Sequence, residues 1–339
     1  MSTALAAPLR AAPRAPITPQ PAPTAERGEV AFELAMRHAG TRRVVLRYEI
    51  SGAASAPLLL VAGGISAHRH VRAHACDETA GWWESQSGEG AFLHPERSRV
   101  IGFDWLGADG TLDAVIDPAD QADGFALALD ALGIARVDAF VGASYGAMVA
   151  LQFAARHAGR VGRVVAIGGA HRAHPWSSAL RAVQRRAVVL GALQFDERHG
   201  LALARQLAML SYRTPAEFDA RFAACRVAGD HVRADAEDYL EHCAEAWLER
   251  ATATGFLRLS ESIDLQCVDP RDVRVPLTVV AVRQDLLVPV DDLRALARRA
   301  GGACELHVID SRYGHDAFLK EPEAIGAIVA QALAAGAVA

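Results

Sequence analysis

Ser144 stands between Gly142 and Gly146 in the stretch F-V-G-A-S-Y-G-A, residues 140–147. An apolar run precedes this serine and a helical stretch follows it, so the serine lies where a strand turns into a helix. G-x-S-x-G in that context is typical of a nucleophilic serine on a sharp turn, because small residues two positions away clear the adjacent strand and helix. Free N–H groups at the helix N-terminus would then face the developing negative charge. The alternative is a close-packed turn with an incidental serine.

A nucleophilic serine needs a base, and the base needs an acid that orients it. Asp285 directly follows the apolar run 276–283, and His315 follows the run 304–310 in a G-H-D-A-F loop. If these runs are parallel strands, both residues lie at the same sheet edge as Ser144. The order Ser, Asp, His is that of α/β hydrolases. We predict a Ser144–His315–Asp285 triad; the alternatives are a turn residue for Asp285 and a solvated loop for His315.

The loop V-A-G-G-I-S-A-H follows the strand candidate 57–62 and contains Gly63 and Gly64. Acyl transfer requires an oxyanion hole, built from the N–H after the nucleophile and an N–H from such an early loop. We therefore predict that Tyr145 and either Gly63 or Gly64 donate to the oxyanion. A plain tight turn is the alternative for the two glycines.

The elements that must position these residues alternate along the chain. Strand candidates are 42–50, 57–62, 98–105, 137–142, 163–168, 276–283 and 304–310. Helical stretches are expected at about 119–133, 145–157, 290–300 and 321–335. Nearly continuous apolar strands between helices predict a mostly parallel, doubly wound α/β sheet, the α/β-hydrolase fold.

This alternation stops between 171 and 270, where amphipathic helical stretches follow one another without a convincing strand. We expect this segment to form a helical cap over the edge where parallel sheets bind ligands. The core is then 29–170 and 271–339. Residues 1–28, rich in Pro and Ala, are expected to be a disordered leader without the apolar core of a secretory signal.

Composition excludes several function classes. The chain has 339 residues, 51% of them hydrophobic, and a formal net charge of −5. Without a dense Lys/Arg block, nucleic acid is not an expected partner, and no apolar run reaches the roughly 18 residues of a membrane span. The five scattered cysteines contain no C-x-x-C pair, so neither a disulfide framework nor a metal site is expected, and a cytoplasmic location fits.

Several stretches together resemble the homoserine O-acyltransferases of the α/β-hydrolase superfamily. They are G-W-W-E (81–84), S-R-V-I-G-F-D-W-L-G (98–107), L-A-R-Q-L-A-M-L-S-Y-R-T (203–214), F-D-A-R-F (218–222) and G-H-D-A-F-L (314–319). The resemblance covers residue 30 to the C-terminus. It implies transfer of an acyl group from acyl-CoA to homoserine, or in some branches serine, through an acyl-serine, as in methionine biosynthesis.

The resemblance also assigns residues and partners. Arg205 matches the arginine that binds the amino acid's carboxylate, and Asp316 matches the residue that holds its ammonium group. A zwitterionic acceptor does need one cation and one anion near the triad. No cofactor is implied, since acyl-CoA is a co-substrate, and members of the family are commonly homodimers through the cap.

The chain departs from the family at the positions that select the acyl group and the acceptor. It has G-A-S-Y-G-A in place of G-G-S-M-G-G, and Gly63, Gly64 and Ile65 in place of L-T-G. The Tyr145 ring is therefore expected near the acyl pocket or the cap. The start of the cap is basic, with Arg172, Arg181, Arg185 and Arg186. For any one of these arginines, a position on a solvated helix face is the favoured alternative. A succinyl carboxylate would need a cation, so we favour succinyl-CoA.

Four alternatives remain open at this point. They are acetyl-CoA as donor, serine as acceptor, an esterase or thioesterase with the same triad and water as acceptor, and a non-catalytic binding module. Arg205 and Asp316 argue against a simple esterase, which needs neither of them.

Overall fold

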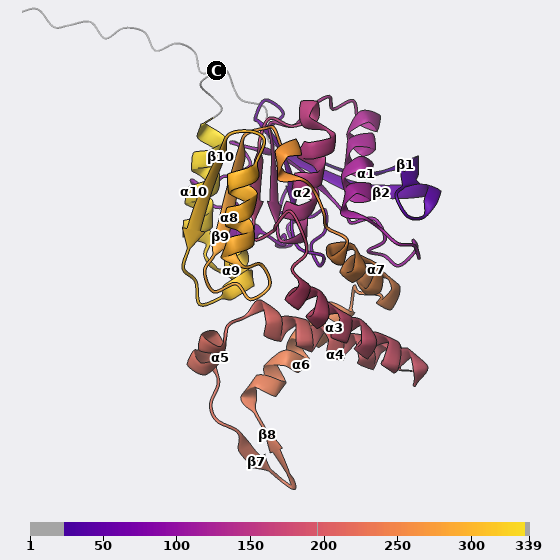
Figure 1. The fold of residues 1–339 in the computed structure, drawn as a ribbon, viewed down its shortest axis with the longest axis vertical. Helices are drawn as coiled ribbons and strands as arrows, with labels where there is room; N and C mark the ends of the chain where they lie inside the picture. Colours follow the sequence, from indigo (N-terminus) through magenta and orange to yellow (C-terminus); the bar gives the residue numbers. More distant parts are fainter. Residues whose placement is uncertain (1–23, 195, 336–339) are drawn as a thin grey trace, which may run out of the picture.

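The computed structural model describes residues 24–194 and 196–335, which contain an eight-stranded sheet (Figure 1). Its strand order is β1-β2-β4-β3-β5-β6-β9-β10. The bounds are β1 Thr24–Met36, β2 Gly40–Gly52, β3 Leu58–Ala62, β4 Arg99–Phe103, β5 Ala139–Ala143, β6 Val164–Ile167, β9 Leu277–Val282 and β10 Cys304–Ile309. β2 runs antiparallel to both of its neighbours, and all the other pairs are parallel. All seven predicted strands are present, with ends that differ by a few residues.

Helices cover both faces of this sheet, as the apolar strands predict. α1 (Pro118–Ala131), α2 (Tyr145–Arg156) and α8 (Val290–Arg299) pack through Phe125, Phe153 and Leu293 into one hydrophobic layer. α10 (Pro322–Ala334) packs on the other face, where Ile325 and Val329 belong to the same hydrophobic cluster as Trp83. The doubly wound α/β-hydrolase fold is therefore confirmed.

The N-terminal boundary differs from the prediction. Residues 24–28, which we assigned to a disordered leader, are the first residues of β1, a 13-residue strand that pairs along its whole length with β2. The alternation of V-A-F-E-L-A-M at 30–36 is a strand pattern that the Pro/Ala-rich leader obscured. Residues 1–23 lie outside the described part of the chain.

The segment 171–270 contains five helices, and most of this segment lies below the sheet in Figure 1. They are α3 Pro175–Leu193, α4 Glu197–Tyr212, α5 Pro215–Arg221, α6 Asp235–Leu248 and α7 Ala253–Asp264. Our expectation of no strand here was wrong. β7 (Arg226–Ala228) and β8 (His231–Arg233) form a short hairpin, whose turn contains Gly229 at φ +66°. Strands of three residues are too short to give a periodic signal.

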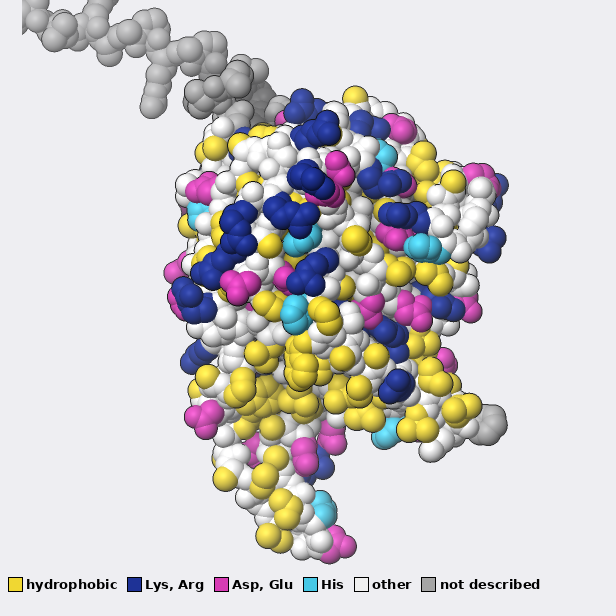
Figure 2. All heavy atoms as spheres, viewed as in Figure 1, with side chains coloured by type: hydrophobic (Ala, Val, Ile, Leu, Met, Phe, Trp, Pro, Cys, Tyr) yellow, Lys and Arg dark blue, Asp and Glu magenta, His cyan; other side chains and the backbone are white. Residues whose placement is uncertain are grey.

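Several large apolar side chains of the cap are exposed. Figure 2 shows hydrophobic side chains gathered over the cap helices. The exposed apolar residues on α3 and α4 are Trp176, Val183, Val189, Leu190, Leu193, Leu203 and Leu210. In the described part of the chain, no helix is both long and apolar enough to cross a membrane.

Candidate active site

Ser144 occupies a strained turn between β5 and α2. With φ 55° and ψ −118°, it is the one non-glycine residue at positive φ among residues 24–194 and 196–335. A Cβ on Gly142 would lie 2.3 Å from the carbonyl oxygen of Gly146, and one on Gly146 would lie 2.2 Å from that of Ala62. Glycine is therefore required on both sides, and the strain at Ser144 is typical of a functional position.

His315 links Ser144 to Asp285. Its Nε2 lies 2.8 Å from Ser144 Oγ, and its Nδ1 lies 2.7 Å from Asp285 Oδ2. The other oxygen of Asp285 accepts the backbone N–H groups of Leu287 at 2.7 Å and Val288 at 3.0 Å, which fixes the carboxylate. Burial disfavours the charged imidazolium, but the charge and hydrogen bond of Asp285 outweigh it and raise the pKa of His315. The structure thus brings together the three residues of the predicted triad in a hydrogen-bonded chain.

The loop after β3 borders the serine through Gly64. A Cβ on Gly64 would lie 4.0 Å from Ser144 Oγ. Two hydrogen bonds to its backbone carbonyls fix the loop. The carbonyl oxygen of Gly64 accepts a hydrogen bond from Trp105 Nε1 at 2.9 Å, and the carbonyl oxygen of Gly63 accepts one from the Gly146 N–H at 2.8 Å. Tyr145 is the first residue of α2, so its N–H has no acceptor within the helix. These positions suit an oxyanion hole.

The Tyr145 side chain does not contribute to the pocket. Its hydroxyl lies 2.6 Å from Ser262 Oγ of α7, and its ring packs edge-on against Trp105 with the ring centroids 4.7 Å apart. Burial raises the pKa of this hydroxyl. Of the two places expected for the ring, the cap and the acyl pocket, the side chain therefore reaches the cap, at Ser262. Tyr145 does not line the cavity next to Ser144 that is described below.

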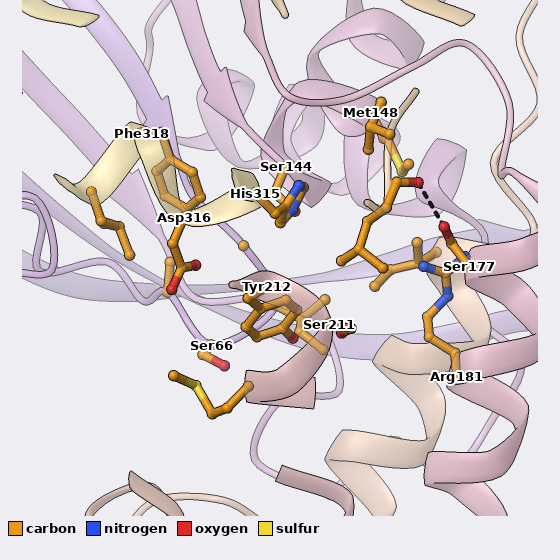
Figure 3. Close-up of a pocket in the computed structure, with 18 of the residues that line it drawn as sticks. Ser66, Ser144, Met148, Ser177, Arg181, Ser211, Tyr212, His315, Asp316 and Phe318 are labelled. Atoms are coloured by element: carbon orange, nitrogen blue, oxygen red, sulfur yellow. Dashed lines mark hydrogen bonds between the residues drawn. The ribbon is translucent and has the colours of Figure 1, made fainter. Parts of the chain in front are cut away.

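A cavity of about 540 Å³ opens above Ser144 between the cap and the sheet (Figure 3). Ser144, His315, Arg205 and Asp316 all line it. Its other cationic lining residues are Arg172, Arg181, Arg213, Arg250 and Lys320. The cavity therefore places the predicted triad and the two predicted substrate-binding residues around one space rich in positive charge.

Arg205 has no carboxylate partner in the described part of the chain. Its guanidinium carbon lies 5.8 Å from the Tyr212 ring centroid and 5.5 Å from that of Trp247, and its Nε is buried without a hydrogen bond. A buried hydrogen-bond donor without an acceptor is energetically costly. Arg205 is therefore suited to bind an anionic ligand.

Asp316 is buried, and one of its two carboxylate oxygens already pairs with an arginine. Its Oδ2 accepts Arg213 Nε at 2.7 Å, and the Arg213 Nη1 donates to Glu217 at 2.9 Å. Sequence reasoning missed this arginine, and it gave no role to Tyr212, whose ring centroid lies 5.9 Å from that of His315. Both residues belong to the quoted S-Y-R-T stretch, but only the fold brings that stretch to the His315 loop.

The four cap arginines have different environments. Arg172 pairs with Asp292 at 2.5 Å and lines the cavity. Arg181 and Arg185 share Asp264, at 2.7 Å and 2.8 Å, and of these two only Arg181 lines the cavity. Arg186 is exposed and lines no part of it. The basic stretch is thus not a single anion-binding surface.

Glu49, His70 and His74 form the one group among the described residues whose side chains could hold a metal ion, with ligand atoms within 4.8 Å of one another. Arg27 Nε donates to Glu49 at 2.5 Å, and the guanidinium lies 3.1 Å from His70 Nδ1. Because a guanidinium already neutralises the carboxylate, we interpret this group as an ionic cluster that ties β1 to the loop after β3.

Comparison with known proteins agrees with the geometry. A model of the alpha/beta hydrolase fold matches residues 57–322. The chain is 56% identical to a homoserine O-succinyltransferase of Xanthomonas campestris pv. campestris. The matched region covers 94% of this chain and 86% of that protein. It is 33% identical, over 85% of its length and 91% of the relative's, to an L-serine/homoserine O-acetyltransferase of Streptomyces lavendulae.

Among solved structures, the homoserine O-acetyltransferase of Bacillus anthracis superposes with a TM-score of 0.81 at 18% identity, covering 91% of this chain and 97% of that one. Esterase E22 superposes with a TM-score of 0.82 at 17% identity, covering 91% and 100%. At these identities the superpositions show the fold alone. The fold model and the two sequence relatives together show that the chain belongs to the α/β-hydrolase fold family and, within it, to the homoserine O-acyltransferases.

Proposed function

We propose that the protein transfers a succinyl group from succinyl-CoA to the hydroxyl of L-homoserine, through a succinyl ester on Ser144. The observation that carries the proposal is the chain Ser144–His315–Asp285 at the base of a cavity that also contains Arg205 and Asp316. The homoserine O-succinyltransferase at 56% identity supports this donor and this acceptor. The product would serve methionine biosynthesis.

In the first half-reaction, His315 Nε2 takes the proton of Ser144 as Oγ attacks the thioester carbon. The N–H groups of Tyr145 and of Gly63 or Gly64 hold the oxyanion. The carbon–sulfur bond breaks, the imidazolium returns its proton to the CoA thiolate, and CoA leaves. Asp285 stabilises the imidazolium and keeps it oriented.

In the second half-reaction, homoserine enters with its carboxylate at Arg205 and its ammonium group at Asp316. His315 removes the proton from the homoserine hydroxyl, whose oxygen attacks the succinyl ester. The same proton then goes to Ser144 Oγ as the ester bond breaks, which releases O-succinylhomoserine and restores the enzyme. The core sheet and its loops thus supply the triad, and the cap, 171–270, supplies Arg205. No bound cofactor is needed.

A matrix of donors and acceptors tests this proposal. Acetyl-CoA and succinyl-CoA are each combined with homoserine, serine or no acceptor, while CoA release and product mass are followed. We expect succinyl-CoA with homoserine to give the highest kcat/KM. CoA release that does not depend on an acceptor would favour the thioesterase reaction, and a preference for acetyl-CoA or serine would reassign the substrate.

We further propose a cytoplasmic homodimer that assembles through the cap. The exposed apolar side chains of α3 and α4 form a patch of the kind that marks an association surface. The five cysteines are free, which fits a reducing compartment. Leu190→Glu on α3 should yield a monomer by light scattering after gel filtration, whereas Val45→Glu, at an exposed apolar site on β2, should not. A monomeric wild-type protein would contradict the dimer.

A further inference from the structure

One wall of the cavity carries more buried positive charge than negative. Arg181 and Arg185, one turn apart on α3, both contact Asp264 of α7, at 2.7 Å and 2.8 Å. Two guanidinium groups therefore share one carboxylate, which leaves a surplus of one positive charge. Such a surplus in a largely buried position is unfavourable unless an anion completes it.

Of the two arginines that share Asp264, Arg181 is the one that lines the cavity. Ser177, Arg181 and Gln184 lie on one buried face of α3, at spacings of four and three residues, and all three line the cavity. Arg185 does not line it and instead donates to Ser260 Oγ at 3.0 Å. The two arginines share the carboxylate but not the access to the cavity.

Part of the Arg181 guanidinium remains free for a ligand. Its Nε donates to Asp264 at 2.7 Å, and its Nη2 lies 3.3 Å from Ser178 Oγ. Its Nη1 has no hydrogen-bond partner within residues 24–194 and 196–335, although the residue is only 9% exposed. Figure 3 shows Arg181 beside Ser177, on the opposite side of Ser144 and His315 from Asp316.

The other cations of the cavity are either matched or less buried. Arg213 has two carboxylates, Asp316 and Glu217, and Arg172 has Asp292. Arg250 and Lys320 are exposed. Arg205, the proposed site of the acceptor carboxylate, is less buried than Arg181 and lies over the rings of Tyr212 and Trp247.

We propose that Arg181 binds the terminal carboxylate of the succinyl group and thereby selects a dicarboxylic acyl donor. This assignment rests on the proposed function and deepens it. A succinyl chain attached to Ser144 has to place its carboxylate inside the cavity, where an unpaired charge is costly. The Nη1 of Arg181 supplies two N–H donors there. An acetyl group has no charge to place and gains nothing from this arginine.

The test compares Arg181→Gln with Arg185→Gln, since each variant leaves Asp264 one arginine partner. CoA release in the presence of homoserine is measured with succinyl-CoA and with butyryl-CoA, an acyl chain of equal length without the carboxylate. We expect Arg181→Gln to lower kcat/KM for succinyl-CoA by roughly 10- to 150-fold, the range of charged hydrogen bonds. Its kcat/KM for butyryl-CoA should stay unchanged, and Arg185→Gln should keep the wild-type ratio between the donors.

The assignment would be overturned if Arg181→Gln lowered kcat/KM for succinyl-CoA and for butyryl-CoA by the same factor. It would also be overturned if Arg185→Gln reduced the ratio of the two kcat/KM values as much as Arg181→Gln does. Either result would leave only a structural role for Arg181. A wild-type enzyme that releases no CoA from succinyl-CoA would instead contradict the proposed function itself. The melting temperatures of both variants, measured alongside, separate a folding defect from a lost contact. If Arg181→Lys retained more activity with succinyl-CoA than Arg181→Gln, this result would support the role of the positive charge at position 181.

Discussion

Arg213 and Asp316, 103 residues apart in the chain, form a buried ion pair in which Nε donates to Oδ2 at 2.7 Å. Arg213 follows the last residue of α4 in the cap, and Asp316 directly follows His315. The pair therefore connects the cap to the loop that carries the proposed base. It also fixes the carboxylate that we assign to the homoserine ammonium group.

Arg213→Gln should destabilise the protein by about 3–5 kcal/mol, because it leaves Asp316 and Glu217 as buried carboxylates without their shared partner. The KM for homoserine should also rise as Asp316 loses its fixed position. Urea unfolding and steady-state kinetics measure the two effects. Arg221→Gln is the matched control: Arg221 also contacts Glu217 but is 43% exposed, so about 1 kcal/mol or less is expected. Equal costs for the two variants would contradict this account.

Arg205→Gln should raise the KM for homoserine by roughly 10- to 150-fold, because the acceptor carboxylate loses a charged hydrogen-bond donor. In the mechanism that we propose, the first half-reaction precedes the binding of homoserine, so rapid-quench measurement of CoA release from the donor should give the wild-type rate. Arg198→Gln, at an exposed position on the same helix, provides the control. A slower first half-reaction with an unchanged KM for homoserine would assign Arg205 to the donor instead.

The pH dependence should report the pair of His315 and Asp285. Asp285 raises the pKa of His315 against the effect of burial, and the base must be neutral to accept a proton. Activity should therefore fall as the pH drops through this raised pKa. Asp285→Asn removes the raising charge, so the acidic limb of the kcat/KM profile should move to lower pH while kcat falls by about 10⁴-fold. An acidic limb that stays in place or moves to higher pH would contradict the assignment.

Tyr145→Phe should leave kcat/KM nearly unchanged, because we assign the oxyanion to the backbone N–H of Tyr145 and because the ring does not line the cavity. Loss of the bond between the hydroxyl and Ser262 should reduce the free energy of unfolding by about 1–3 kcal/mol. In a double-mutant cycle, Ser262→Ala should add little to Tyr145→Phe. A change in donor preference in Tyr145→Phe would place the side chain in the acyl site after all.

The sheet and the triad could be predicted because their signals are local. Continuous apolar runs mark the parallel strands, and the carboxyl ends of parallel strands meet at one edge, so Ser144, Asp285 and His315 follow from their positions after strands. The two glycines around Ser144 reflect contacts that no side chain could fit. β1 was missed because its first residues continue a Pro/Ala-rich stretch.

The partners of the charged residues could not be predicted in the same way. Arg181 and Asp264 lie 83 residues apart and meet only because α3 crosses α7, and Arg213 reaches Asp316 through the approach of α4 to the His315 loop. Helical periodicity shows which face of α3 is buried, but not which carboxylate neutralises it. Which arginines remain available to a substrate is therefore a property of the tertiary structure.

Mass spectrometry of the enzyme after a brief exposure to succinyl-CoA, without acceptor, tests the central claim most directly. We expect the peptide that contains Ser144 to gain the mass of one succinyl group. Addition of homoserine should remove this group and form O-succinylhomoserine, and Ser144→Ala should show no such adduct. Wild-type turnover in Ser144→Ala, or an adduct on another residue that homoserine discharges at the catalytic rate, would contradict it.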